Sequence, residues 1–77
     1  MKKLSELRNN STGIITSLDG DRRFMSRITS IGLTPGSRVK VIKNEKNMPL
    51  LVYSRDTMIA LNRSECEQIG VEEGMVS

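Results

Sequence analysis

Short apolar runs separated by turn-forming residues limit this chain to a fold made mostly of short strands. The runs are rich in β-branched residues or alternate apolar with polar side chains, as strands with one buried face do. The expected strands are Thr12–Leu18, Arg38–Lys43, Leu50–Ser54, Thr57–Leu61 and a brief one over residues 69–71. Short strands joined by turns favour a small closed or partly open β-barrel. The predicted fold class is therefore mainly β with short helices.

The length of the chain sets the number of domains. Its 77 residues leave room for one domain with one core, which we place over residues 1–77. We expect order over residues 4–71 and a frayed end over residues 72–77. Because Phe24 and Tyr53 are the two aromatic residues, the core must be built from Leu, Ile, Val and Met.

One segment, residues 22–31, has the periodicity of an amphipathic helix. Asp21 precedes it as an N-cap, because its carboxylate can accept from free backbone N–H groups. Gly32 follows it at the position where a left-handed helix terminus favours glycine. The apolar side of this helix consists of Phe24, Met25, Ile28 and Ile31. The polar side consists of Arg23, Arg27 and Ser30.

Two shorter helical pieces are expected nearer the ends of the chain. Residues 3–7 can form one helical turn. Asn62 or Ser64 can cap a helix across residues 65–68, since Ser64 and Glu67 have the spacing of a capping box.

Two tight turns complete the pattern. Thr34-Pro35-Gly36 fits a type II turn, because proline presets φ at the first central position and glycine accepts a positive φ at the second. We expect Leu33, just before this turn, to tuck onto the core. Arg55-Asp56 is a two-residue connection, which predicts a hairpin although Asn-Gly is the favoured pair.

The absence of histidine removes the commonest general base. Without histidine and with a single cysteine, the chain cannot form a Ser-His-Asp or Cys-His system or a structural zinc site. We interpret Cys66 as a small apolar residue on the inner face of the last helix. The glycines form no phosphate-binding motif. We therefore expect no enzyme and no catalytic residue.

Two pairs of nearby carboxylates are candidate metal ligands. Asp19 and Asp21 are separated by one residue, and Glu72 and Glu73 are adjacent. A hard cation such as Ca²⁺ takes six or more oxygen ligands, and capping already explains Asp21. We therefore expect no dedicated metal site and no cofactor.

Cysteine usage and hydropathy indicate the compartment. A single cysteine forms no intramolecular disulfide, which fits a reducing compartment. The first residues lack the apolar core of a signal peptide, and the longest apolar runs, residues 50–53 and 58–61, are far too short to span a membrane. We expect a cytoplasmic protein that does not insert into the membrane.

The charge pattern gives a weak indication of the partner. The formal net charge is +3, from 12 Lys and Arg against 9 Asp and Glu, which biases the protein toward acidic partners. The residues that can form a basic patch are Arg22, Arg23, Arg27, Arg38, Lys40 and Lys43. A solvated surface is the simplest interpretation, and protein docking and nucleic-acid binding are the alternatives. Nucleic acid is not the expected partner, because small barrels that bind it add aromatic platforms for base stacking.

The order of these signals resembles the FeoA family of bacterial ferrous iron uptake over nearly the whole chain. The most specific element is Gly32-Leu33-Thr34-Pro35-Gly36 followed by a strand that alternates basic and apolar residues. The supporting segments are residues 4–7, 13–15, 18–21, 27–28, 31–39, 59–63 and 69–71.

The resemblance implies an SH3-like barrel with a helix after the first strand. It also implies a role beside the membrane transporter FeoB, with the cytoplasmic GTPase domain of FeoB as the contact. The same domain type occurs at the carboxyl end of iron- and manganese-responsive repressors, so association with Fe²⁺ or Mn²⁺ is implied, although the ligand pattern gives it little support. The chain departs from the family at Ser54-Arg55-Asp56, where many members have a glycine, and this puts the shape and contacts of that hairpin in doubt.

Our leading hypothesis is a non-enzymatic accessory protein of ferrous iron transport, recruited to the inner face of the membrane by FeoB and monomeric or weakly self-associating. The alternatives are a metal-responsive module and, with less support, a small nucleic-acid-binding barrel. Arg23 and Arg27 would steer an acidic partner, and Leu33 would be an apolar anchor if it is exposed. The candidate partner surface consists of Arg23, Arg27, Leu33, Thr34, Pro35 and Gly36.

Overall fold

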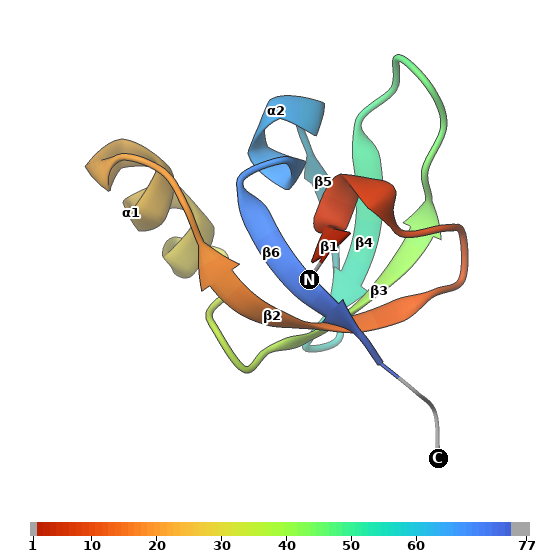
Figure 1. Cartoon of the computed structure of the whole chain (residues 1–77), viewed down its shortest axis with the longest axis horizontal. Helices are drawn as coiled ribbons and strands as arrows, with labels where there is room; N and C mark the ends of the chain where they lie inside the picture. Colours follow the sequence, from red (N-terminus) through yellow and green to blue (C-terminus); the bar gives the residue numbers. More distant parts are fainter. Residues whose placement is uncertain (1, 75–77) are drawn as a thin grey trace.

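A computed structural model describes residues 2–74, which fold into one antiparallel sheet with three short helical segments (Figure 1). The strands follow the order β1-β6-β2-β3-β4-β5 across the sheet. No helix in the described part of the chain has the length and apolar character needed to cross a bilayer. The elements are β1 (Lys2–Lys3), the 3-10 helix η1 (Leu4–Glu6), β2 (Thr12–Leu18), α1 (Arg22–Ser30), β3 (Arg38–Lys43), β4 (Leu50–Ser54), β5 (Thr57–Leu61), α2 (Arg63–Cys66) and β6 (Ile69–Glu73).

The four strands β2 to β5 begin and end where the sequence predicts. The end of the chain differs, because β6 continues through Glu72 and Glu73, and Glu73 pairs with Gly13 of β2. The prediction of a frayed end beginning at residue 72 is therefore wrong for these two residues, and residues 75–77 lie outside the described part. The sequence also missed β1, because two exposed lysines carry no strand pattern. Pairing with β6 holds this strand in place.

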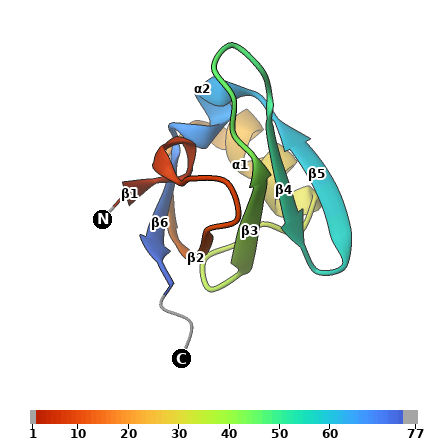
Figure 2. The same ribbon diagram turned by 90° about the vertical axis from the view of Figure 1, so that its right-hand side faces the viewer.

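The sheet curls around the core because two of its strands are irregular. The register shifts between Ile15 and Ser17 in the β2–β6 pair, and between Val41 and Lys43 in the β3–β4 pair. Such bulges bend a strand and increase its twist. Figures 1 and 2 show the result, a strongly curved sheet with η1 and α2 side by side.

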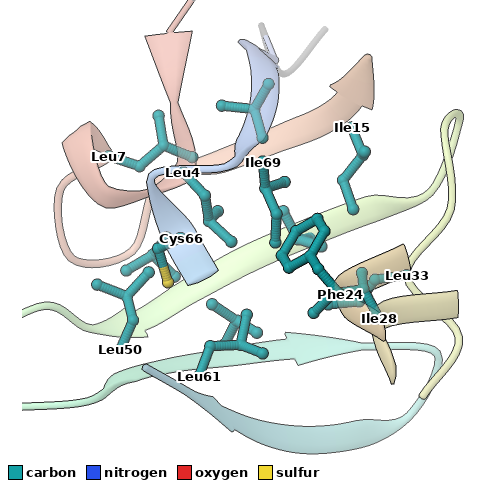
Figure 3. Packing of buried hydrophobic residues seen from close by; sticks show 14 residues of the cluster. Leu4, Leu7, Ile15, Phe24, Ile28, Leu33, Leu50, Leu61, Cys66 and Ile69 are labelled. Carbon is teal, nitrogen blue, oxygen red and sulfur yellow. The ribbon is translucent and has the colours of Figure 1, made fainter. Parts of the chain in front are cut away.

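The core fills the inside of this curve. Figure 3 shows side chains of β2, β6 and α1 pointing toward those of β4 and β5. Apart from the ring of Phe24 and the thiol of Cys66, these side chains are Leu, Ile and Val, as predicted, but the buried cluster of the described residues contains no methionine. The buried cluster consists of Leu4, Leu7, Ile15, Phe24, Ile28, Leu33, Val39, Val41, Leu50, Val52, Leu61, Cys66, Ile69 and Val71.

Helix α1 begins as predicted, with the Asp21 carboxylate accepting from the Phe24 N–H at 2.8 Å. It ends at Ser30 in a Schellman motif. Gly32 has φ 95°, and the N–H groups of Gly32 and Leu33 donate to the carbonyl oxygens of Thr29 and Ile28. This motif turns the chain inward at Leu33.

Ile31 does not join the buried side of α1, contrary to prediction. It is the C-cap residue and is 37% exposed, whereas Phe24 and Ile28 are buried. The physical reason is that the helix stops one residue earlier, so Leu33 takes the place in the core that periodicity assigned to Ile31.

Helix α2 begins two residues earlier than the sequence predicts. Asn62 is the N-cap, and the carboxylate of Glu65 accepts from the Asn62 N–H at 3.1 Å. The expected capping box between Ser64 and Glu67 is therefore wrong. Cys66 lies on the inner face of this helix and is fully buried, which confirms the interpretation made from the sequence.

The loop between β3 and β4 is held to the rest of the fold by Arg63. Its guanidinium donates to the backbone oxygens of Glu45 at 2.9 Å and Met48 at 2.8 Å, and to Asn44 Oδ1 at 2.5 Å. Asn44 Nδ2 donates in turn to the backbone oxygen of Leu7 at 2.6 Å. A polar loop is thereby fixed against α2 and the segment after η1.

The β4–β5 hairpin turns through two residues, as predicted. Arg55 has φ 54° and Asp56 has φ 61°, so both occupy the left-handed region that a type I′ turn requires. The missing family glycine therefore does not lengthen the loop. Two non-glycine residues adopt a conformation that L-amino acids disfavour.

Candidate docking surface

The structure divides the six predicted surface residues into buried and exposed groups. Arg23 and Arg27 are exposed on α1, and Pro35 and Gly36 are exposed on the turn that follows. Thr34 is half-buried. Leu33 is 0% exposed, so it cannot act as an apolar anchor for a partner. The Schellman motif places its side chain against Ile28 in the core, which explains this correction.

The Thr34-Pro35-Gly36 turn is held firmly against β2. The Ser37 N–H donates to the Thr34 carbonyl oxygen at 2.9 Å, and Gly36 has φ 95°, as a type II turn requires. The Gly36 N–H donates to the Ile15 oxygen at 2.7 Å, and the Ile15 N–H donates to the Ser37 oxygen at 2.9 Å. The turn therefore presents a fixed shape to solvent.

Arg27 connects the two α-helices. Its Nε lies 2.5 Å from Oε2 of Glu65, at the start of α2. The hydrogen bond and charge of Glu65 raise the pKa of Arg27. The hydrogen bond from Arg27 is the main cause that lowers the pKa of Glu65. Arg23, one turn earlier on α1, has no ion pair within residues 2–74 and is the better placed of the two arginines to meet an acidic partner.

A second exposed region, which the sequence did not single out, lies on the convex side of β3, β4 and β5. Lys40 pairs with Tyr53, and Tyr53 pairs with Met58, so the three side chains form one row across three strands. Tyr53 is 40% exposed and Met58 is 54% exposed. We call this region the outer face and define it as Arg38, Lys40, Leu51, Tyr53, Met58 and Ala60.

The outer face has a fixed tyrosine at its centre. The Tyr53 hydroxyl donates to Asp56 Oδ1 at 3.1 Å, and this hydrogen bond is the main cause that raises the pKa of Tyr53. The signal that could have revealed the face is the alternation within β4 and β5. Leu50, Val52 and Leu61 point inward, which leaves Leu51, Tyr53, Met58 and Ala60 on the outside.

The candidate metal ligands among the described residues are scattered or engaged in structural contacts. No group of three or more Cys, Asp or Glu side chains within residues 2–74 is placed to hold a metal ion. Burial raises the pKa of the Cys66 thiol to about 12, which makes this thiol a poor nucleophile and metal ligand. Asp21 caps α1, and Glu73 pairs with Lys2 at 2.8 Å. Each of the two predicted carboxylate pairs therefore has one member in structural use.

The predicted basic patch is not one surface. Arg22, Arg23 and Arg27 lie on α1, whereas Arg38, Lys40 and Lys43 lie on β3. Lys43 pairs with Glu45 at 3.7 Å, and Arg27 pairs with Glu65. Within the described residues, the cations of the predicted patch that have no ion pair are thus divided between the helix and the outer side of the sheet.

A comparison with known families decides to which family the chain belongs. The model of the FeoA domain matches residues 2–73. The chain belongs to the FeoA family. A curated relative, the putative Fe(2+) transport protein A of Methanocaldococcus jannaschii, is 33% identical over 60 residues, which cover 78% of this chain and 72% of the relative. FeoA membership links the chain to ferrous iron transport.

Solved structures agree with this assignment. The FeoA protein of Stenotrophomonas maltophilia, described as a prokaryotic SH3 domain protein in complex with zinc, has a TM-score of 0.82 at 25% identity, covering 94% of this chain and 91% of that chain. An FeoA described as an iron uptake regulatory protein has a TM-score of 0.90 at 22% identity, covering 94% and 96%. A manganese-dependent transcriptional repressor has a TM-score of 0.86 at 20% identity, covering 94% of this chain and 41% of that chain.

These likenesses confirm the predicted SH3-like, mainly β fold. The helix follows the first long strand, β2, as the resemblance implied. The short β1 adds one strand before it.

Proposed function

We propose that this FeoA protein is a non-enzymatic accessory protein of ferrous iron transport that works in the cytoplasm by binding the GTPase region of the transporter FeoB. The observation that carries the proposal is the match of the FeoA domain to residues 2–73, because it accounts for nearly all of the described fold. The name of the curated relative, a putative Fe(2+) transport protein, supports the transport context.

The exposed part of the predicted surface is the contact that we favour for this partner. Arg23 supplies a charge that has no ion pair among residues 2–74, and the Pro35-Gly36 turn supplies a rigid projection of the backbone. A rigid surface loses little conformational entropy on binding. An exposed guanidinium accelerates association with an acidic surface and makes it sensitive to salt.

The test is a titration of fluorescently labelled protein into the purified cytoplasmic region of FeoB, with and without guanine nucleotide. We expect saturable binding that weakens with salt and about tenfold weaker binding for Arg23→Glu. Arg8→Glu is the matched control, because Arg8 is also exposed but lies in the loop after η1. Absence of binding in both nucleotide states would overturn the proposal. Equal weakening by the two variants would remove Arg23 from the contact.

A metal-responsive module is the second candidate, favoured by the zinc complex of the Stenotrophomonas maltophilia relative. It predicts that Fe²⁺, Mn²⁺ or Zn²⁺ raises the melting temperature of the protein by mass action. The candidate would be ruled out if the melting temperature is unchanged at a free metal concentration about 100 times the Kd of a typical micromolar site.

A further inference from the structure

The outer face combines exposed apolar side chains with cations that have no ion pair in the described part of the chain. Figure 2 views the molecule from this side, with β3 and β4 in front of α1. We propose that the outer face is a second docking surface, which binds an acidic amphipathic segment of a partner protein. This surface lies on the opposite side of the sheet from α1. The inference therefore stands or falls independently of the contact between Arg23 and FeoB.

The apolar part of the outer face consists of two cross-strand pairs. Tyr53 lies opposite Met58, and Leu51 lies opposite Ala60, in adjoining positions on β4 and β5. Cross-strand neighbours on one face have Cβ atoms about 5 Å apart, so the four side chains form one continuous patch. Tyr and Met are enriched at protein interfaces, and contiguous exposed apolar groups mark binding sites more often than scattered ones do.

The charged part of the outer face borders this patch on one side. Lys40 is the β3 neighbour of Tyr53, and Arg38 lies two residues away on the same side of β3. Neither has an ion pair within residues 2–74. The nearby acid, Asp56, already accepts the Tyr53 hydroxyl. Charge complementarity therefore selects a segment whose apolar residues cover Tyr53 and Met58 while its carboxylates reach Lys40 and Arg38.

Charge also argues against a second copy of this chain as the occupant. Pairing of two outer faces would bring Lys40 and Arg38 from both copies into one interface. The acid of the adjoining hairpin turn is Asp56, and its carboxylate is engaged by Tyr53. A symmetric dimer repeats the same patch on both sides, so four cations would be desolvated without matching acids.

The hairpin prepares the outer face for binding. The Tyr53 hydroxyl is held by Asp56, and Asp56 belongs to a two-residue turn whose φ angles are fixed in the left-handed region. Ordering side chains at an interface costs roughly 0.5–1.5 kcal/mol for each flexible group. A tyrosine that is already positioned avoids most of this cost and is a residue type found at binding hot spots.

The test is a titration of ¹⁵N-labelled protein with a synthetic helical peptide of about 16 residues, in which Leu residues form one side and Glu residues border it. We expect NMR shift changes centred on Lys40, Tyr53 and Met58. Met58→Ser and Lys40→Glu should each weaken binding about tenfold. The controls are Met48→Ser, because Met48 is 53% exposed in the β3–β4 loop, and Lys3→Glu on β1. Unfolding curves of all four variants establish that they fold.

Four outcomes would overturn the proposal. The first is no shift change at about 1 mM peptide, where even weak complexes form. The second is equal binding of a peptide with the same composition in scrambled order, and the third is an equal effect of the control variants. The fourth is shift changes at the same residues that are caused only by phosphatidylglycerol vesicles or by raising the protein concentration. Loss of binding confined to Met58→Ser and Lys40→Glu would support it.

Discussion

Gly20 is the residue where the structure most clearly requires glycine for space. A Cβ at this position would lie 2.5 Å from Cδ2 and 2.7 Å from Cγ of the Phe24 ring. That ring is buried in the core, so it has little freedom to move away.

We predict that Gly20→Ala lowers the free energy of unfolding by about 1–3 kcal/mol, because overpacking displaces the Phe24 ring. Urea denaturation measures the change. Gly74→Ala is the control, since its added Cβ would have Thr12 Oγ1 at 3.6 Å as the nearest atom, an ordinary contact. A Gly20→Ala protein as stable as the control would show that the ring has room to shift.

Single residues also show where sequence patterns are ambiguous. The sequence predicted both Ile31 and Leu33 on the core side; the structure confirms the burial of Leu33 but exposes Ile31. A period of 3.6 residues does not state where the helix stops, whereas the αL glycine at position 32 does. Cap geometry therefore decides the last apolar positions of a short helix.

At the scale of elements, α1 and α2 are joined by Arg27 and Glu65, which are 38 residues apart. The folded pKa of Glu65 is lowered, so this carboxylate stabilises the fold above the unfolded Glu pKa of about 4.3. The contribution is lost as the pH falls through the lower folded pKa, where the carboxylate takes up a proton.

We therefore predict that Glu65→Gln destabilises the protein at pH 6, and that the difference from wild type shrinks as the pH falls below about 4. Unfolding curves in urea at a series of pH values measure this. Glu67→Gln is the control, because Glu67 is exposed and has no ion pair among the described residues. A Glu65→Gln difference that stays constant or grows in acid would contradict the assignment.

The β3–β4 loop gives a second prediction at this scale. Arg63→Met removes the donors to Glu45, Met48 and Asn44 but keeps an apolar stem of similar length. We expect a loss of about 1–3 kcal/mol in unfolding free energy, because hydrogen bonds from a charged group are among the stronger ones. Amide exchange in the loop should also become faster.

Arg22→Met provides the comparison for Arg63→Met, since Arg22 is exposed at the start of α1. Unchanged amide exchange in the β3–β4 loop of Arg63→Met would show that Arg63 does not hold it. Neither the Arg63 network nor the Arg27–Glu65 pair could be predicted from sequence. Both join segments that are distant along the chain and adjacent only after the sheet has formed.

For the molecule as a whole, local sequence patterns were sufficient to predict the position of most helices and strands. Alternation and turn residues located β2 to β5, because each of these strands is bounded by turn-forming residues. The strand order β1-β6-β2-β3-β4-β5 was not available from the residues alone, because β1 and β6 come from opposite ends of the chain. The outer face depends on that pairing too, since Lys40, Tyr53 and Met58 meet only through the β3–β4–β5 register.

Cys66 provides a probe of global stability. It is 0% exposed, and burial raises the pKa of its thiol to about 12, so a thiol reagent can reach a reactive sulfur only after the fold opens. We predict that labelling in native buffer is at least about 10³-fold slower than in denaturant, and that its rate follows the unfolding free energy of each variant above.

Labelling kinetics with a chromogenic disulfide reagent measure both quantities. Fast labelling of the folded protein would instead show that α2 opens locally, since Cys66 is the last residue of this helix. Labelling that is slow but unrelated to the stability of the variants would point to the same conclusion.

The pairing of β1 with β6 brings Lys2 beside Val71 and Lys3 beside Gly70. If the domain were joined to other domains, the segments before β1 and after β6 would therefore leave it at the same corner. A module built in this way can be appended to, or inserted into, another protein through a single attachment point. This geometry suits a fold that also occurs within a manganese-dependent repressor, where the similar region makes up 41% of the repressor chain.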